Sequence, residues 1–210
     1  MPMLAPGLKG YPHSAPPRSV RDIGAARWNV LAGDLPFPIA LLRREALEHN
    51  IAWMQARVRQ WGIDFAPHGK TTMSPQLFAR QIDAGAWGIT FANVTQTAIG
   101  VAAGVRRGLI ANQVMSASDL SGLQALLASH ADLRVLFLVD SVAQLELIEA
   151  WAREQAAPHA FEVLIEIGYA GGRTGCRSHD EAVALAARLH ASPAVRLVGI
   201  ESYEGTTQID

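Results

Sequence analysis

Cysteine is almost absent from the sequence, since Cys176 is the only one among 210 residues. A single thiol excludes a framework of internal disulfide bonds and suits the reducing cytoplasm. Long apolar runs are missing too: none reaches the roughly 18 residues of a membrane-spanning helix, and residues 1–20 have no apolar core typical of a secretory signal. We therefore expect a cytoplasmic protein with no membrane partner.

The chain also lacks an excess of either positive or negative charge. Charged residues make up 18% of the chain, the net charge is −1, and 50% of the residues are hydrophobic. Disordered proteins combine low hydrophobicity with high net charge, and nucleic-acid-binding surfaces need clustered positive charge. The composition therefore predicts a folded chain with no nucleic-acid partner.

Lysine is rare, which makes the position of each lysine informative. Of the 18 basic residues only Lys9 and Lys70 are lysines, and the rest are arginines. A compositional preference for arginine explains the total, but it does not choose where the last lysine stays. Lys9 lies in a segment rich in proline and glycine, so Lys70 is the only lysine in the part of the sequence with regular hydrophobic periodicity.

The pattern of the sequence changes after residue 34. Residues 1–34 are rich in Pro, Gly and Arg, lack periodicity, and are predicted to form a mostly irregular N-terminal arm. After them, short apolar runs alternate with helical patterns of about a dozen residues. The runs predicted to be strands are Pro38–Leu42, Ile63–Pro67, Trp87–Ala92, Gly108–Ala111, Leu133–Val139, Phe161–Ile167 and Val195–Glu201.

Helix signals occupy the intervals between these runs. An apolar stripe with spacings of three and four residues begins at Leu47 and ends at Trp61. Ser74 followed by Pro75 is typical of a helix start, and Gly85 is typical of a helix end. Three pairs with capping-box spacing, counting Asn as a cap, predict further helix starts: Asn93 with Gln96, Ser141 with Gln144, and Ser178 with Glu181.

The order of these elements predicts an α/β fold with a parallel sheet. Runs such as LRVLFLV are apolar without alternation, which is typical of parallel strands buried on both faces. Strand–helix repeats indicate a doubly wound sheet or a (β/α)8 barrel, and the barrel is favoured because no glycine-rich nucleotide-binding motif occurs. Six or seven strands fall short of the usual eight in about 250 residues, so we expect an incomplete barrel.

Residues that follow the strands are the candidates for function, because ligands of parallel α/β folds bind at the C-terminal strand ends. Lys70 follows one strand, where partial desolvation favours the neutral amine that acts as a nucleophile or base. His68 lies two residues earlier, on the same side of an extended segment. A solvated surface lysine near a helix start fits the spacing equally well.

Two further strand ends carry candidates. The segment Gly168–Gly175 has four glycines and one cation, Arg173, which can face a cofactor ring or a carboxylate. An ordinary turn with a surface arginine is the alternative. Tyr203 can stack on a ring or simply pack at the rim. The other polar residues at strand ends are interpreted as loop amides (Asn112, Gln113) or as helix caps (Asn93, Asp140).

A metal site has little support in the sequence. The seven histidines show no H-E-x-x-H pattern or paired ligand spacing, and Cys176 has no second cysteine to join it. Cys176 is therefore predicted to be a small packed thiol, and no metal ligands are assigned.

Three motifs together resemble the fold-type III pyridoxal-phosphate enzymes, closely the D-serine dehydratase and D-threonine aldolase group with its alanine racemase-like N-terminal domain. The first and most specific is Pro67-His68-Gly69-Lys70-Thr71, similar to the Pro-His-x-Lys-Thr around the family's Schiff-base lysine. Ser74-Pro75 and the stretch QIDAGAWG at 81–88 are also typical of the family. The second motif is Gly172-Arg173-Thr174-Gly175, which follows a strand with acidic residues, and the third is Glu201-Ser202-Tyr203-Glu204-Gly205. The resemblance runs from about Pro36 to Gly205.

The resemblance implies that Lys70 carries pyridoxal 5′-phosphate and that His68, Arg173 and Tyr203 also belong to the cofactor site. It implies a small D-amino acid as substrate and a homodimer for the full-length family form. It also assigns residues 35–61, with Pro38–Leu42, to a segment that leads from a small β-domain into the barrel. Residues 62–210 would then form a partial barrel with six of eight strands.

The same resemblance predicts a truncated chain. The family's last two barrel strands, its phosphate loop and its C-terminal β-domain would follow Asp210, as would the His/Cys metal pair of several members. A divalent metal is therefore expected only where that part is supplied.

Thr72-Met73 stands where many aldolases and dehydratases have His-Lys, and HGKTTMSPQLF looks more like the branch described as amino-acid deaminases. The resemblance therefore favours a lyase that converts a D-hydroxy amino acid such as D-serine into a 2-oxo acid and ammonia. Retro-aldol cleavage of the D-threonine aldolase type is one alternative. A non-catalytic pyridoxal-phosphate-binding protein, or an inactive truncated chain, is another.

Overall fold

The computed structural model describes residues 3–205, and its backbone contacts separate two compact units that divide between Asn50 and Ile51. In the first unit, β1 (Met3–Leu4) pairs antiparallel with β2 (Arg18–Ser19). Two 3-10 helices follow, η1 (Val20–Ala26) and η2 (Val30–Ala32). None of the side chains predicted to be functional lies in this unit.

The strand predicted at Pro38–Leu42 is wrong. Residues 35–43 contain no helix or strand, and neither described sheet includes them. Leu41 and Leu42 are 56% and 73% exposed, and Pro38 has no N–H to donate to a ladder. An apolar run forms a strand only where another backbone pairs with it, and the sequence pattern does not report that partner.

The second unit contains a parallel sheet whose strands follow one another in chain order. Its strands are β3 (Ile89–Phe91), β4 (Arg107–Gln113), β5 (Arg134–Val139), β6 (Phe161–Ile167) and β7 (Val195–Ser202). Five of the predicted strands are thus confirmed. The parallel arrangement places all C-terminal strand ends at one edge.

A sixth strand position precedes β3. The N–H of Thr90 donates to the carbonyl of Pro67 at 2.9 Å, and the N–H of Gly69 donates back to the carbonyl of Thr90 at 2.7 Å. His68 and Thr90 form an isolated parallel bridge. The pairing thus extends past Ile63–Pro67, the run predicted as a strand, as far as Gly69.

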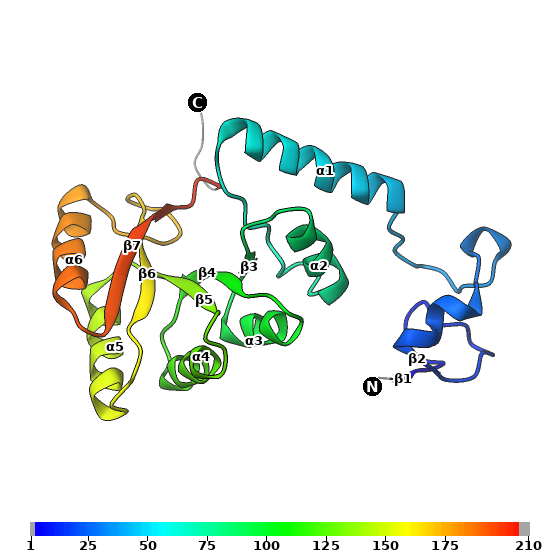
Figure 1. Ribbon diagram of the computed structural model, residues 1–210, viewed down its shortest axis with the longest axis horizontal. Coiled ribbons are helices and arrows are strands. Elements are labelled where there is room, and N and C mark those ends of the chain that lie inside the picture. Colours follow the sequence, from blue (N-terminus) through cyan, green and yellow to red (C-terminus); the bar gives the residue numbers. More distant parts are fainter. Residues whose placement is uncertain (1–2, 206–210) are drawn as a thin grey trace. The chain divides into compact units, whose positions relative to one another are not determined.

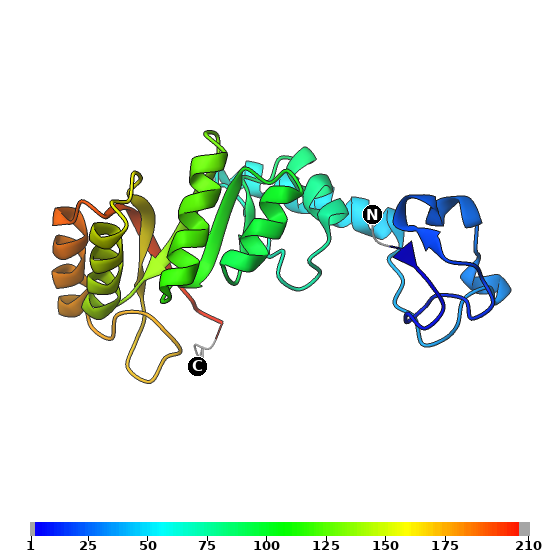
Figure 2. The same ribbon diagram turned by 90° about the horizontal axis from the view of Figure 1, so that it is seen from below.

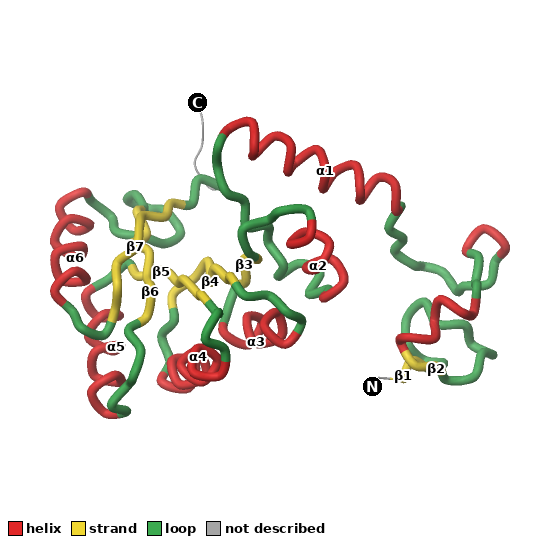
Figure 3. The backbone as a smooth tube through the Cα atoms, in the orientation of Figure 1, coloured by secondary structure: helices red, strands yellow, loops and turns green. Residues whose placement is uncertain are grey.

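Helices cover one side of the sheet. Figure 1 shows α2 to α6 in an arc beside the strands, and the tube in Figure 3 shows the same alternation of red helices and yellow strands. The helices of this arc are α2 (Pro75–Asp83), α3 (Val94–Ala102), α4 (Ala117–Ser129), α5 (Val142–Glu154) and α6 (His179–Ala191). The helix α1 (Arg44–Trp61) precedes them in the chain and spans the division between the two units. In Figure 2 the yellow-green α5 and the orange α6 lie side by side. The predicted α/β class is confirmed.

The predicted helix caps explain why helices begin directly after the strands. The side chains of Asn93, Ser141 and Ser178 each accept a hydrogen bond from the N–H three residues later. Each such bond satisfies a helix N–H that would otherwise have no partner. The α2 start differs, because Ser74 makes no side-chain cap bond although Pro75 occupies the first turn as predicted.

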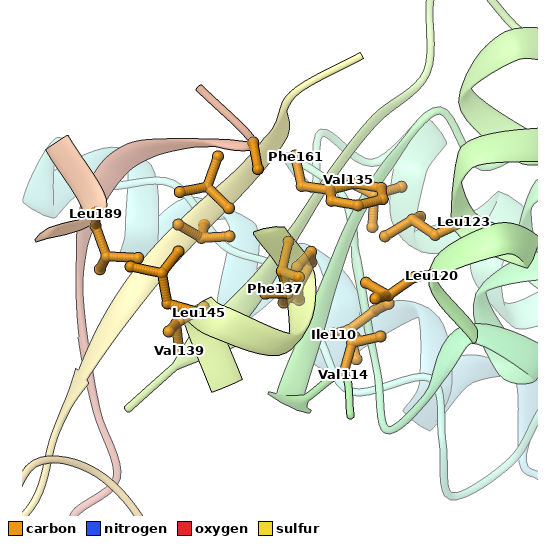
Figure 4. Close-up of a cluster of buried hydrophobic side chains, with 14 of the residues drawn as sticks. Ile110, Val114, Leu120, Leu123, Val135, Phe137, Val139, Leu145, Phe161 and Leu189 are labelled. Atoms are coloured by element: carbon orange, nitrogen blue, oxygen red, sulfur yellow. The ribbon is translucent and has the colours of Figure 1, made fainter. Parts of the chain in front are cut away.

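The main core lies between the sheet and the helices. Alternate residues of β5, namely Val135, Phe137 and Val139, point toward α4 and α5 and are buried there with Leu120 and Leu145 (Figure 4). Burying each large apolar side chain contributes roughly 1.5–3 kcal/mol. Because side chains alternate along a strand, the intervening residues of β5 face the opposite side of the sheet, away from these helices.

The sheet is open within residues 3–205. β7 pairs with β6 and with no other described strand, and Ile200 on it is 73% exposed. Five strands and the His68–Thr90 bridge give the six strand positions of the predicted partial barrel. No helix within the same residues is long and apolar enough to cross a bilayer.

Two buried glutamines test how much hydrogen bonding contributes to this core. Gln124 has neither amide atom paired within the described residues, whereas Gln144 donates to the carbonyl of Leu138 at 2.9 Å. We predict that Gln124→Leu raises the free energy of unfolding by about 1 kcal/mol because it removes an unsatisfied amide. The matched Gln144→Leu should lower it by about 1–3 kcal/mol, since it strands a buried carbonyl. Urea denaturation measures both, and equal effects would contradict the prediction.

Candidate active site

A cavity of about 340 Å³ lies at the C-terminal ends of the strands, in the second unit. Its walls include all four side chains predicted from the sequence, His68, Lys70, Arg173 and Tyr203. Residues separated by more than a hundred positions along the chain therefore meet in one place.

The backbone before Lys70 is held tightly, and this fixes where the lysine side chain starts. A Cβ atom on Gly69 would lie 2.6 Å from Cγ2 of Ile89 and 2.7 Å from the ring of Phe78, so the position accepts only glycine without a shift of its neighbours. The N–H of Met73 closes the following turn by donating to the carbonyl of Gly69 at 2.9 Å. Packing under Gly69 thus positions Lys70 at the cavity.

The prediction that the Lys70 side chain is partly desolvated is wrong in the structure of residues 3–205. The side chains of Lys70 and His68 are both exposed, because the cavity opens to solvent on one side. His68 is nevertheless perturbed: partial burial and, second, the positive charge of Lys70 lower the pKa of its imidazole below 6.5. His68 is therefore mainly neutral at pH 7 and can accept a proton there.

Arg173 and Tyr203 contact each other across the cavity. The guanidinium carbon of Arg173 lies 5.7 Å from the centroid of the Tyr203 ring, which is within the range of a cation–π interaction. Both side chains line the same cavity as Lys70. An amine, a fixed cation and an aromatic ring are therefore presented together.

Sequence reasoning missed a set of polar residues beneath these three. Glu166 on β6 is only 3% exposed and accepts hydrogen bonds from the hydroxyl of Thr174 and, at 2.5 Å, from Nε2 of Gln113. The same Nε2 donates to Oδ2 of Asp140 at 3.0 Å. The interpretation of Gln113 as a loop amide is therefore wrong, since it lies on β4 and bridges two carboxylates.

The assignment of Asp140 as a helix cap is also wrong, because Ser141 caps α5 and Asp140 precedes it. The acceptor oxygen of Asp140 instead binds Gln113 and, at 3.0 Å, the N–H of Gly175. Asn93 is a cap, as predicted. A signal for the missed group was available in the run FEVLIEI, where an acidic residue interrupts a buried strand.

Glu201 adds a second acid to the cavity. It pairs in register with Glu166 on the neighbouring strand, and its Oε2 is buried with no hydrogen-bond partner within the described residues. Burial raises the pKa of the Glu201 carboxyl, and the negative charges of Glu166 and Glu204 raise it further. Glu201 therefore keeps its proton to higher pH than an ordinary glutamate.

Cys176 is buried, as predicted, and next to the glycine-rich segment. Burial, followed by the negative charge of Asp140, raises the pKa of its thiol, which makes it a poor nucleophile. Residues 3–205 hold no group of three or more His, Cys, Asp or Glu side chains placed to bind a metal ion.

The cavity fits a pyridoxal-phosphate cofactor by the chemistry of its side chains. Lys70 provides the primary amine that can bond to the aldehyde of the cofactor. Arg173 provides a donor that keeps its charge, and Tyr203 provides a ring face for the pyridine. This donor set at the strand ends of a parallel β/α unit is typical of the barrel class of pyridoxal-phosphate-binding proteins.

Comparison with known families agrees with this class. Residues 42–210 match the model of the alanine racemase N-terminal domain. The chain therefore belongs to this family, whose members are fold-type III pyridoxal-phosphate enzymes. The resemblance inferred from the three motifs is confirmed.

Two curated relatives extend the comparison. The chain is 35% identical over 174 residues to D-threo-3-hydroxyaspartate dehydratase of Delftia sp. (strain HT23), which covers 82% of this chain and 44% of that protein. It is 30% identical over 171 residues to D-threonine aldolase of Arthrobacter sp., with 81% and 44% covered. Both relatives are pyridoxal-phosphate-dependent lyases. The chain spans 44% of the length of either.

Solved structures give the same result. The crystal structure of D-threonine aldolase from Filomicrobium marinum superposes with a TM-score of 0.76 at 27% identity, and covers 97% of this chain and 48% of that one. The Delftia dehydratase superposes with a TM-score of 0.72 at 34% identity. The partial parallel barrel predicted from the sequence is therefore confirmed as the fold.

Substitution of Gly69 tests whether packing positions Lys70. We predict that Gly69→Ala lowers the free energy of unfolding by about 1–3 kcal/mol because the new methyl group overlaps Ile89 and Phe78. Gly122 in α4 is the matched control, since a Cβ there meets Val94 at an ordinary 3.5 Å. Gly122→Ala should raise stability by roughly 0.5–1 kcal/mol through helix propensity. Urea denaturation compares the two, and a neutral Gly69→Ala would contradict the packing argument.

The raised pKa of Glu201 makes a prediction about stability and pH. Between its ordinary and raised pKa the native state holds the proton more tightly than the unfolded chain, so this group's contribution to stability falls as pH rises through that window. Glu201→Gln removes the charge and should raise the melting temperature at pH 7 but not at pH 4. Glu154→Gln, an exposed change of equal charge, should show no such difference. A pH-independent effect of Glu201→Gln would count against the assignment.

Proposed function

We propose that this chain forms the cofactor-bearing half of the active site of a pyridoxal-phosphate-dependent lyase that acts on a D-amino acid. One observation carries the proposal: Lys70 shares a single cavity at the strand ends with Arg173 and Tyr203. Because the chain spans 44% of the length of its curated relatives, the proposal concerns the protein in which this cavity is complete.

Each side chain receives a role that its chemistry allows. Lys70 holds the cofactor through its ε-amino group and, when substrate replaces it, accepts the proton of the substrate's Cα at Nζ. Arg173 contributes a permanent cation and Tyr203 a stacking face, while neutral His68 can accept a hydrogen bond. When bound, pyridoxal phosphate withdraws electrons from the substrate's Cα.

We favour elimination of ammonia from a D-hydroxy amino acid such as D-serine. In this reaction the β-hydroxyl leaves as water, which requires a proton donor in the cavity. Glu201 meets the requirement, because its carboxyl keeps a proton to raised pH and one of its oxygens is unpaired within the described residues. Release of the 2-oxo acid and ammonia then needs only water.

Retro-aldol cleavage is the second candidate, supported by the similarity to two D-threonine aldolases. It requires a base at the β-hydroxyl, and the lowered pKa of His68 suits that task. D-threonine separates the two reactions in one assay of the full-length protein. Elimination gives 2-oxobutyrate and ammonia, whereas cleavage gives acetaldehyde and glycine. The homodimer and the cytoplasmic location stay predictions.

Covalent labelling tests the cofactor role directly. We predict that incubation of the chain with pyridoxal 5′-phosphate, reduction with borohydride and peptide mass mapping place the label on Lys70. Lys70→Arg should abolish this label, and Lys9→Arg, which removes the other lysine, should leave it in place. Label confined to Lys9 and the amino terminus would refute the role of Lys70. Label on Lys70 without turnover in the full-length protein would instead favour a non-catalytic cofactor-binding protein.

A further inference from the structure

Arg173 lies on a loop whose conformation needs an explanation. Residues 168–175 contain no helix or strand. The backbone hydrogen bonds that join this loop to the rest of the unit lie at its base, where the N–H of Gly168 donates to the carbonyl of Cys176 at 3.0 Å and the N–H of Cys176 donates to the carbonyl of Glu166 at 2.8 Å. Within the loop itself, the N–H of Gly172 donates to the carbonyl of Tyr169 at 2.9 Å, which closes a turn just before Arg173. The attachment of the part that carries Arg173 to the neighbouring strands therefore depends on side-chain contacts.

One of these contacts comes from Arg177, directly after the loop. Its Nη1 donates to the carbonyls of Tyr169, Gly172 and Thr174 at 3.1, 2.9 and 3.3 Å. Arg177 is exposed, so water competes for the same carbonyls and weakens these bonds. They gather the loop but do not anchor it to the sheet.

The anchoring contacts come from the neighbouring strand ends. Glu166 on β6 accepts the hydroxyl hydrogen of Thr174, and Asp140, after β5, accepts the N–H of Gly175 at 3.0 Å. Gly175 has a φ of +89°, and a Cβ there would lie 2.4 Å from the nitrogen of Gly168, so this turn requires glycine. The two residues that follow Arg173 are thus tied to two different strands.

Gln113 joins the two carboxylates. Its Nε2 carries two hydrogens, and both are used: one for Asp140 at 3.0 Å and one for Glu166 at 2.5 Å. A carboxylate at this position would place a third negative charge beside the other two, and an apolar side chain would leave both without their shared donor. The amide therefore makes the arrangement of the two acids possible.

The arrangement is costly for stability alone. Glu166 is 3% exposed, and within residues 3–205 neither Glu166 nor Asp140 forms a salt bridge with a cation. Burial of a carboxylate without a cation carries a desolvation cost that its hydrogen bonds must offset, and an apolar side chain would fill the same space without that cost. The carboxylate oxygens of Glu166 and Asp140 are instead placed to accept hydrogen bonds from Thr174 and Gly175.

We propose that Gln113, Asp140 and Glu166 form a clamp, here called the amide–carboxylate clamp, that positions the guanidinium of Arg173 for the cofactor by holding Thr174 and Gly175. The clamp residues act through Arg173 and are positioning residues. The inference rests on the proposed function, in which Arg173 faces the cofactor. It adds that three strand ends, β4, β5 and β6, set the position of that cation.

Substitutions at two clamp contacts separate positioning from folding. Gln113→Leu removes the bridging amide, and Thr174→Val replaces the hydroxyl with a methyl group of similar size. Thr174→Ser keeps the hydroxyl and should restore what Thr174→Val loses. Gln124→Leu is the matched control for Gln113→Leu, because it makes the same change at a buried amide outside the cavity.

Two readouts apply to each variant. Titration with pyridoxal 5′-phosphate, followed by the visible absorption band and its induced circular dichroism, reports affinity and the fixed orientation of the cofactor. We expect Gln113→Leu and Thr174→Val to raise the dissociation constant by about tenfold or more and to weaken the induced dichroism, since each removes a hydrogen bond to a buried charge. Label after reduction should stay on Lys70.

The second readout needs no cofactor. Trypsin cleaves after arginine, so the rate at the bond between Arg173 and Thr174, measured by peptide mass mapping, reports the order of the loop. Both variants should raise this rate by roughly fivefold or more, because loss of local contacts lowers the free energy of local opening. Cleavage after Arg27, in the first unit, serves as the internal standard.

These experiments distinguish a failure of the clamp proposal from a failure of the proposed function. If the unaltered chain takes no label on Lys70, the proposed function fails, and the tryptic rates alone decide about the clamp. Rates and dissociation constants equal to those of Gln124→Leu would overturn the clamp, as would a Thr174→Ser variant that behaves like Thr174→Val.

Discussion

The parallel pairing of Phe65–Gly69 with β3 is the interaction on which the cavity depends. Backbone hydrogen bonds join the two segments, and the hydroxyl of Thr90 adds a bond to the carbonyl of Ala66 at 2.7 Å. This register decides that the chain leaves the sheet at Lys70, level with the ends of the next strands. A shift by one residue would turn Lys70 toward the helices, because successive side chains point to opposite faces.

Sequence reasoning succeeded where the signal is local. Helix caps such as Asn93 act within three residues, and this cap is confirmed. The motif around Lys70 is contiguous in the sequence, and its lysine lies at the cavity. The contact between Gln113 and Glu166 spans 53 residues and depends on strand order and register, which no local pattern encodes. The strand at Pro38–Leu42 failed for the same reason, since strand formation requires a partner elsewhere in the chain.

Charges of opposite sign line the cavity from different strands. Lys70 and Arg173 contribute cations, whereas Glu166 and Glu201 contribute acids from β6 and β7. Glu201 lies in register beside Glu166, so burial raises the pKa of the Glu201 carboxyl and the negative charge of Glu166 raises it further. The site therefore holds exchangeable protons next to permanent positive charge, an arrangement that suits proton transfer at a carbon next to an amine.

Glu166 and Glu201 differ in the hydrogen bonds that their carboxyl groups receive, and this difference assigns them different roles. Glu166 has a hydrogen-bond donor on each of its oxygens, the hydroxyl of Thr174 and the amide of Gln113. Glu201 has a buried oxygen without a donor, and no described group offsets its desolvation. The pair of strands β6 and β7 thus presents two carboxyls with different tasks. Glu166 holds the loop and must accept hydrogen bonds, whereas Glu201, whose buried oxygen has no donor, is the acid able to give a proton.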